Sequence, residues 1–525
     1  MDRRAFLRLM AAGALATALP RCGGGASGGR LFRMNLRSEP PTLDPNLATD
    51  NVSLRVLTNL MEGLTAYGDG LRPVPAAAER WEVLDGGARV LFHLRPDGRW
   101  SDGVPVTARD FEFSWKRFLD PETAAEYAYF LYDVEGAEAY NTAKSGDAAG
   151  VGVRALDDLT LEVRLARPVV FFPMITTFMV LFPLRPDVIA RHGDAWTEPG
   201  HFVGNGPFAL EAWRHEYKVS LRRNPHYRAA PRIEGVDFFM VNEPTVELTL
   251  FERGDLDFAL LPIVEIPRYE ESPLFHRKPM LRAEYYGFNC KKLPFNDPRV
   301  RRAFSLAIDR SVFPRILHGG ETPMASWIPP GMFAHEPDIG LHFDLDAARS
   351  ALAEAGFAGG RGFPRVDLAV NTGEEPRRVA ENMQSQWKES LGVTVRLRNV
   401  EWKAYLKEIA TDPPGIWRLG WGADYPDPDN FMNLFTAASG NNHTRWGSAE
   451  FDRLVADAAL DADKSRRKAM YDDAQRILCA EAAAIMPLYS RAHNFLVSPR
   501  VEGLWINEMD YLYLDRVSVR EEAEA

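Results

Sequence analysis

The stretch from residue 365 to residue 400 constrains the fold of this chain more than any other. It begins with the apolar run "RVDLAVNT" and ends with a similar run, "VTVRLRNV". Between the two runs, apolar residues recur at the spacing of one helix face, and Gly392 follows the last of them as a helix-ending glycine does. These apolar residues are Val379, Met383, Trp387 and Leu391. A strand, a helix and a second strand in this order predict a mixed α/β sheet.

Further segments support this fold class. Helices are predicted for "DPRVRRAFSLAIDRSVF", "DLDAARSALAEAGF", "FDRLVADAAL" and "MYDDAQRILCAEAAAIMPLYS", and the last two are expected to cover the sheet. In the first third, "ARVLFHLRPDGRW" and "DLTLEVRLA" predict strands at half-buried sheet edges. A chain of 525 residues exceeds one ordinary core, so two or three lobes are expected.

The charge balance excludes some classes of partner. The formal net charge is -11 at pH 7, and the pI is about 5.6. Neither value favours nucleic acid or an anionic membrane surface as a partner. Charged residues make up 26% of the chain and hydrophobic residues 46%, so the composition is that of a globular protein.

Residues 1–22 predict an export signal. Arg3 and Arg4 precede Phe6 and a short apolar run that ends at Pro20, which is too short to span a bilayer. The pattern "RRAFLR" is similar to the twin-arginine export motif. An ordinary Sec signal is the alternative.

Cys22 ends this segment and predicts a lipid anchor, with the glycine-rich residues 23–30 as a flexible tether. Lipoprotein signals normally carry small residues before the cysteine, whereas Pro20 and Arg21 stand here. Plain cleavage near Ala16 or Ala18 is therefore the alternative to lipidation.

Several kinds of chemistry are absent from the sequence. The eleven histidines show no metal-binding spacing, and there is neither a phosphate loop nor a dinucleotide glycine motif. We therefore expect no metal, no cofactor and no enzymatic activity. Cys290 and Cys479 are expected to be free thiols, with a disulfide as the alternative. Asp427 and Asp429 are interpreted as turn and helix-cap carboxylates, ahead of a calcium loop or a general acid/base pair.

The segment "WGADYPDPDNF" resembles the signature of the family 5 extracellular solute-binding proteins, which are the peptide-binding components of ABC importers. The likeness covers nearly the entire mature chain, and its oligopeptide-binding branch is favoured by "EWKAYL" and "GWGADYPDP". Further matching segments, in the family's order, are "PTLDPNLATDNVSLRVLTNLMEGL", "FHLRPDGRWSDGVPVTARDFEFSWKR", "VGNGPFAL", "LPFNDPRVRRAFSLAIDR" and "IMPLYSRAHNFLV".

The resemblance implies the large, three-lobed form of the type II periplasmic-binding-protein fold, with the ligand in a cleft between lobes one and three. We expect lobe two at residues 61–181 and lobe three at residues 283–491. Lobe one is expected to combine residues 31–60, 182–282 and 492–525.

The resemblance also implies a function. The chain is expected to be a monomer that captures oligopeptides by hinge closure and delivers them to the permease subunits of an ABC transporter. It would act in the periplasm or at the outer face of the cytoplasmic membrane. The alternatives are another ligand within the same family (a dipeptide, an oligosaccharide, an opine or a metal chelate), an envelope peptidase or hydrolase, and a receptor or chaperone for unfolded chains.

The family resemblance assigns roles along one segment. Trp421, Gly422 and Ala423 are expected to form a strand beside the peptide backbone, and Asp424 to pair with the peptide's α-amine, with a turn or helix cap as the alternative. Arg418 is expected to meet the peptide's carboxylate, or else to pair with a carboxylate of lobe two or three.

Aromatic side chains are expected to wall the side-chain pockets, with core packing as the alternative for each. The candidates are Trp402, Trp421, Tyr425 and Tyr489, followed by Tyr127 and Tyr129. The stretch Thr49, Asp50 and Asn51 matches a ligand-contacting segment of lobe one. Pro376 stands where related binders carry a further cation, which puts tolerance of peptide length in doubt.

Overall fold

The computed structural model of the chain describes residues 30–142 and 147–520. The predicted export signal, Cys22 and nearly all of the predicted tether lie outside the described residues. Among the helices that are described, none is both long and apolar enough to cross a membrane.

The main sheet of the described residues has eleven strands, in the order β15-β14-β16-β12-β17-β11-β1-β10-β9-β8, with β13 paired to β17. The predicted strand-helix-strand unit is confirmed. β14 (Val366–Asn371) and β15 (Val395–Val400) pair in parallel, and α11 (Glu374–Leu391) connects them. Gly392 ends that helix in the left-handed conformation, with φ of 71°.

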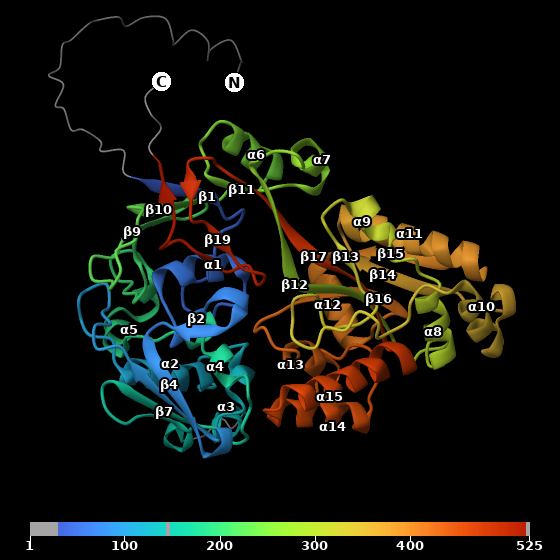
Figure 1. The fold of residues 1–525 in the computed structure, drawn as a ribbon, viewed down its shortest axis with the longest axis horizontal. Helices are drawn as coiled ribbons and strands as arrows, with labels where there is room; N and C mark the ends of the chain where they lie inside the picture. Colours follow the sequence, from blue (N-terminus) through green and yellow to red (C-terminus); the bar gives the residue numbers. More distant parts are fainter. Residues whose placement is uncertain (1–29, 143–146, 521–525) are drawn as a thin grey trace, which may run out of the picture.

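Two long strands occupy the middle of this sheet. β12 (Phe275–Phe288) and β17 (Ile485–Val497) pair with each other in antiparallel fashion, and both run between the two halves of the molecule (Figure 1). Their register is interrupted between Pro279 and Ala283, next to the lobe boundary expected after residue 282. The lobe boundaries themselves stay a prediction.

On one side of these strands lies the half built from the N-terminal third, the middle of the chain and the C-terminus. Its strands in the main sheet are β1 (Leu31–Asn35), β8 (Phe208–Arg214), β9 (Lys218–Arg223), β10 (Gly235–Phe239) and β11 (Phe258–Leu260). Its helices include α1 (Asn51–Leu60), α5 (Pro186–His192), α6 (Pro244–Glu252) and α7 (Ile266–Tyr269). Short strand pairs complete it: β2 (Thr65–Tyr67) with β3 (Pro73–Pro75), β18 (Val501–Glu502) with β21 (Ser518–Val519), and β19 (Trp505–Ile506) with β20 (Leu512–Tyr513).

The predicted second lobe contains a separate antiparallel sheet. Its order is β4 (Ala78–Leu84), β5 (Arg89–Leu94), β7 (Thr160–Arg164) and β6 (Val153–Ala155). Helices α2 (Ala108–Leu119), α3 (Ala137–Thr142) and α4 (Phe172–Ile175) belong to the same part of the chain. The strands β5 and β7 were expected from their alternating apolar residues, and both are confirmed. The expectation that they are edges was wrong, because β4 and β6 flank them and the alternating pattern does not reveal a strand's neighbours.

The other half carries most of the helices that the sequence predicts. α8 (Pro298–Leu306) follows the capping residue Asp297, and α10 (Leu345–Glu354) follows Asp344. The remaining elements of this half are α9 (Val312–Leu317), β13 (Thr322–Pro323), α12 (Trp402–Thr411), β16 (Ile416–Gly422), α13 (Asp429–Met432), α14 (Ala449–Leu460) and α15 (Lys464–Arg476). The helices expected from the sequence are thus confirmed, with two differences in extent. The segment "DPRVRRAFSLAIDRSVF" is divided between α8 and α9. The helix expected over "MYDDAQRILCAEAAAIMPLYS" ends at Glu481, and the expectation was wrong for "IMPLYS", which begins β17.

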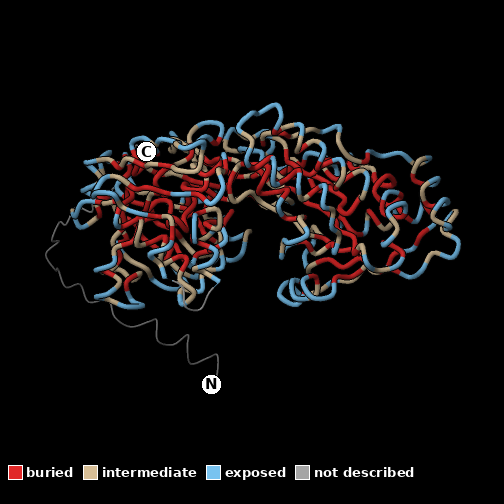
Figure 2. The backbone as a smooth tube through the Cα atoms, turned by 90° about the horizontal axis from the view of Figure 1, so that it is seen from below, coloured by how far each residue is buried: buried red, intermediate tan, exposed pale blue. Residues whose placement is uncertain are grey.

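Buried chain runs through both halves of the molecule (Figure 2). The two largest apolar clusters meet at β12, whose successive side chains point to opposite faces. Tyr285 belongs to one cluster, while Tyr286 and Phe288 belong to the other. One strand therefore contributes to both cores.

The second and third predicted lobes touch each other directly. The backbone amide of Val170 donates to the carbonyl of Ala459 over 3.3 Å. Nearby, Phe171 stacks on Tyr425 with the ring centroids 5.3 Å apart, and Phe130 meets the same tyrosine edge-on at 5.9 Å. Aromatic pairs of this kind contribute about 0.5–1.5 kcal/mol beyond the area they bury.

A buried ion pair fixes the acidic segment after β16 to α15. Two guanidinium nitrogens of Arg467 donate to the two carboxylate oxygens of Asp427, over 2.8 and 2.6 Å. Asp427 also accepts from the backbone amide of Asp429, as a turn carboxylate does. Its side chain is 3% exposed and that of Arg467 is 8% exposed, so neither charge has water as a substitute partner.

We expect Asp427→Asn to lower the free energy of unfolding by about 3 kcal/mol, because it leaves the Arg467 charge buried without a counter-charge. The matched control is Asp457→Asn, which breaks an exposed pair with Arg453 and should cost only about 0.5 kcal/mol. Urea denaturation of both variants measures the difference. Equal losses would contradict the prediction.

Candidate functional site

The strand β16 presents an open edge where the sequence predicts ligand contact. β14 pairs only with its first two residues, Ile416 and Trp417, whereas β12 pairs along its full length. In an antiparallel pair alternate residues point their backbone groups away from the partner. Because the amide of Ala423 donates to Leu281 of β12, the residues that point away are the even-numbered ones.

Of these residues, Ile416 is paired by β14, and the backbone of Arg418 already has a side chain as its partner. Its amide and carbonyl both bond with the hydroxyl of Tyr405, whose oxygen lies 2.8 Å from the amide nitrogen. Gly420 and Gly422 follow, and their outward backbone groups have no partner within the described residues. An extended ligand could therefore add here as a further strand.

The space beside the two glycines differs. A Cβ at Gly420 would come within 2.6 Å of the carboxylate of Glu284, so a side chain does not fit there. A Cβ at Gly422 would meet only one atom within 4 Å, Nη1 of Arg282 at 3.9 Å. Missing side chains let another backbone approach closely.

Asp424 follows directly after this edge, and Asn430 holds it in place. The side-chain oxygen of Asn430 accepts from the amide of Asp424 over 3.1 Å and from the indole of Trp421 over 2.9 Å. The side-chain amide of Asn430 donates to the Asp424 carboxylate over 3.3 Å. Sequence analysis did not find Asn430, although a buried asparagine inside the helical stretch "DPDNFM" is a usable signal.

The carboxylate of Asp424 has no cationic partner among the residues that the structure describes. Burial raises its pKa to about 6, and the hydrogen bond from Asn430 only partly opposes this effect. At pH 7 the group is therefore mostly ionised, and its residue is half-buried. A cation that binds next to such a carboxylate lowers the free energy of its ionised form.

Four tyrosines from other parts of the chain lie near enough to Asp424 for its charge to act on their hydroxyls. They are Tyr67, Tyr127, Tyr129 and Tyr511. Burial raises the pKa of each hydroxyl, and the charge of Asp424 adds to the effect. The structure thus brings Tyr127 and Tyr129 of the second predicted lobe toward Asp424 of the third. Tyr67 and Tyr511, which the sequence did not single out, each carry a buried hydroxyl without a hydrogen-bond partner in the described residues.

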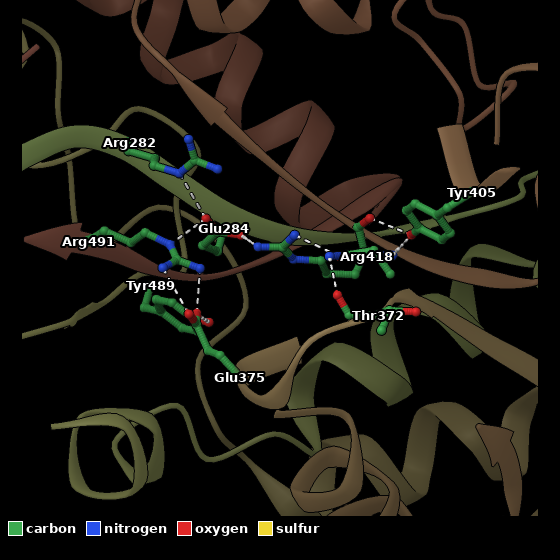
Figure 3. Close-up of polar contacts among 9 residues, drawn as sticks. Arg282, Glu284, Thr372, Glu375, Tyr405, Arg418, Tyr489 and Arg491 are labelled. Atoms are coloured by element: carbon green, nitrogen blue, oxygen red, sulfur yellow. Dashed lines mark hydrogen bonds and ion pairs between the residues drawn. The ribbon is translucent and has the colours of Figure 1, made fainter. Parts of the chain in front are cut away.

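Arg418 lies in a charged cluster on the neighbouring strands (Figure 3). It donates to the carboxylate of Glu284, and its Nη1 donates to Asn371 over 3.0 Å. Of the two roles expected for Arg418, the structure shows the ion pair with a protein carboxylate. Tyr489 is also buried here, and its hydroxyl donates to Glu375 over 3.1 Å.

The other predicted site residues either have local structural roles or are exposed. Tyr425 is buried, and its hydroxyl donates to Asp429 over 2.8 Å. Asp50 caps α1 by accepting from the amides of Val52 and Ser53. Asn51, the first residue of α1, is exposed, as is Trp402 at the start of α12. Ligand contacts for these four residues stay predictions.

A cavity of about 780 Å³ lies elsewhere, between the first and second predicted lobes. Tyr67, Trp505 and Tyr513 are among its aromatic lining residues. Tyr67 lines this cavity and also lies near Asp424. Cys290 and Cys479 are free thiols, and no group of metal-binding side chains is found in the described ranges.

Comparisons with known proteins agree with this arrangement. Residues 72–443 match the model of the bacterial extracellular solute-binding proteins, family 5. The chain is 35% identical to the probable deoxycholate-binding periplasmic protein YgiS of Escherichia coli, over 94% of both chains. It is also 35% identical to the periplasmic oligopeptide-binding protein OppA of Salmonella typhimurium, over 89% of this chain and 88% of that protein.

Solved structures of related binding proteins have a similar fold. The Escherichia coli murein tripeptide-binding protein MppA superposes with a TM-score of 0.80 at 30% identity, over 94% of this chain and 99% of that chain. Haemophilus influenzae OppA in complex with the peptide RPPGFSPFR gives 0.78 at 30% identity, with the same coverage. The chain belongs to family 5 of the bacterial extracellular solute-binding proteins.

Proposed function

We propose that this protein captures peptides outside the cytoplasm and hands them to the permease of an ABC transporter. The observation that carries the proposal is the half-buried carboxylate of Asp424 at the end of an open strand edge, without a cationic partner in the described residues. The α-ammonium of a peptide is a cation of suitable size for that carboxylate. Relatives and structural neighbours whose names state peptide binding support the same ligand class.

In the proposed complex, the ligand lies along β16. Its backbone pairs with Gly420 and Gly422, so that recognition does not depend on side-chain identity. Its α-amine meets Asp424, while Trp421, Tyr127 and Tyr129 face its first residues. The protein performs no chemical step on the ligand.

Delivery in this proposal depends on closure about the two shared strands, β12 and β17. A ligand that contacts both halves favours the closed form, which then docks on the permease. The predicted export signal would direct the protein across the membrane, and lipidation of Cys22 would hold it at the outer face.

Asp424→Asn is expected to weaken the binding of free-amine peptides by at least about tenfold, because removing one partner of a buried charge pair costs about 2–5 kcal/mol. Calorimetry with a free-amine pentapeptide and its N-acetylated form measures this effect. Asp457→Asn, on an exposed helix face, serves as the matched control and should bind as the unmodified protein does.

If N-acetylation does not weaken binding to the unmodified protein, the amine role of Asp424 is wrong. If neither peptide binds at all, the ligand is another solute, and bile acids, sugars, opines and metal chelates are the next probes.

The affinity for free-amine peptides should rise with pH. Asp424 has a pKa of about 6, so below that value it is protonated and cannot pair with an ammonium. Raising the pH from 5 to 7 should therefore strengthen binding by about tenfold. Calorimetric titrations at intervals of half a pH unit measure the profile. Asp424→Asn should flatten it; a profile that survives in this variant would assign the titration to another group.

A further inference from the structure

Three arginines share one buried carboxylate in the charged cluster. Arg418 and Arg491 both bond to Glu284, and Arg282 reaches it through Nε over 3.0 Å. Burial works to raise the pKa of Glu284, but the charges of these arginines lower it to about 2. Glu284 is therefore ionised at every physiological pH, and it cannot neutralise three cations by itself.

Two of the three arginines have further protein partners. Arg491 forms a second ion pair, donating from Nη1 to Glu375 over 3.0 Å. Arg418 donates to Asn371, and its side chain is only 11% exposed. Both guanidinium groups are thus satisfied by the protein itself.

Arg282 differs from both of them. Nε makes its one bond to a described residue, and Nη1 and Nη2 have no hydrogen-bond or ion-pair partner within the described ranges. The side chain is 35% exposed, and Figure 3 shows its terminal nitrogens turned away from the other labelled residues. The outer edge of a guanidinium with two free donors fits a carboxylate in bidentate fashion.

Other charged groups near Arg282 do not supply that carboxylate. Asp510 is held by Arg55, which donates to its two oxygens over 2.6 and 2.7 Å. His493 is buried, and Arg282 is among the charges that lower its pKa, after burial itself. Glu321, near Arg491, accepts from the amide of Gly319 and forms no ion pair in the described residues.

The position of Arg282 relates it to the open strand edge. Arg282 pairs directly with Gly422 across β12 and β16, and its Nη1 is the atom that would lie 3.9 Å from a Cβ on that glycine. Asp424 lies two residues beyond Gly422. One free positive group and one free negative group therefore stand next to the same short stretch of strand.

We propose that Arg282 binds a carboxylate of the ligand that lies within about three residues of the ligand's α-amine. This inference rests on the proposed function, and it adds a second charge requirement to it. An extended residue spans roughly 3.3–3.6 Å, and Asp424 is two residues from Gly422, so a distant carboxylate would lie beyond the reach of Arg282. The carboxylate is either the C-terminus of a tripeptide or an acidic side chain at the second or third residue of a longer peptide.

The test compares peptides that differ by one charge. The first pair is Ala-Ala-Ala with a free C-terminus and the same peptide as its C-terminal amide. The second pair is the pentapeptide amides Ala-Asp-Ala-Ala-Ala and Ala-Asn-Ala-Ala-Ala. All four carry a free α-amine, and calorimetry with the unmodified protein, Arg282→Gln and Arg282→Lys gives the affinities.

The unmodified protein should prefer the charged member of at least one pair by about tenfold, the size expected for a charge-assisted hydrogen-bonded pair. A preference in the first pair identifies the terminal carboxylate, and one in the second pair identifies the acidic side chain. Arg282→Gln should abolish the preference and leave the binding of the uncharged member unchanged. Arg282→Lys keeps the positive charge but loses the paired donors of the guanidinium, so it should retain part of the preference for the charged peptide.

Arg396→Gln is the matched control, because Arg396 lies on β15 of the same sheet, is exposed and pairs with Asp367. It should retain the full preference. Thermal unfolding of each variant shows whether the fold is intact, and the Lys variant keeps the test valid if the Gln variant unfolds.

The proposal is overturned if the unmodified protein shows no preference in either pair, or if the preference survives in Arg282→Gln. Equal weakening of charged and uncharged peptides in that variant also overturns it, because a purely structural role would act on both. If the amine requirement at Asp424 holds in these cases, only the role of Arg282 fails. Failure of every peptide to bind would instead reject the proposed function together with this inference.

Discussion

The antiparallel pairing of β12 with β17 is the interaction on which the rest of the structure depends. These two strands belong to both halves of the molecule, and one of them carries side chains of both large cores on its opposite faces. Every charged residue of the cluster around Glu284 lies on them or on elements that pack against them. Movement of one half relative to the other must therefore bend this pair, next to which the site lies.

The cluster around Glu284 also explains the shape of the strand edge. Its carboxylate occupies the space beside Gly420, so the buried charges and the missing side chain depend on each other. Burying a carboxylate is costly unless cations compensate for it, and three arginines do so here. An apolar residue in place of Glu284 would remove the partner that holds these arginines in place.

The sequence correctly predicts those parts of the molecule that depend on local patterns of residues. The helix through Trp387 and its flanking strands are fixed by hydrophobic spacing and by Gly392, which are both visible without a structure. Asp424 was found through a motif. Asn430 and Arg282 were not, because their importance depends on which atoms of distant residues approach them.

The same limit explains the residues whose roles remain open. Tyr425 and Tyr489 belong to motifs that suggest ligand contact, yet the structure gives each hydroxyl a protein carboxylate as partner. For Arg418 the sequence left two roles open, and only the structure shows Glu284, 134 residues away in the chain, as its partner. Pairing over such separations is decided by topology, which a local pattern does not contain.

The contact of Phe171 with Tyr425 joins the second predicted lobe to the third through protein side chains alone. Its free energy therefore favours the arrangement in which these two lobes touch, whichever solute is bound. The apparent affinity of a binding protein scales with the fraction that is already competent to bind. Substitutions in this aromatic contact would strengthen or weaken all ligands by one common factor, so that affinity and selectivity are controlled by separate parts of the chain.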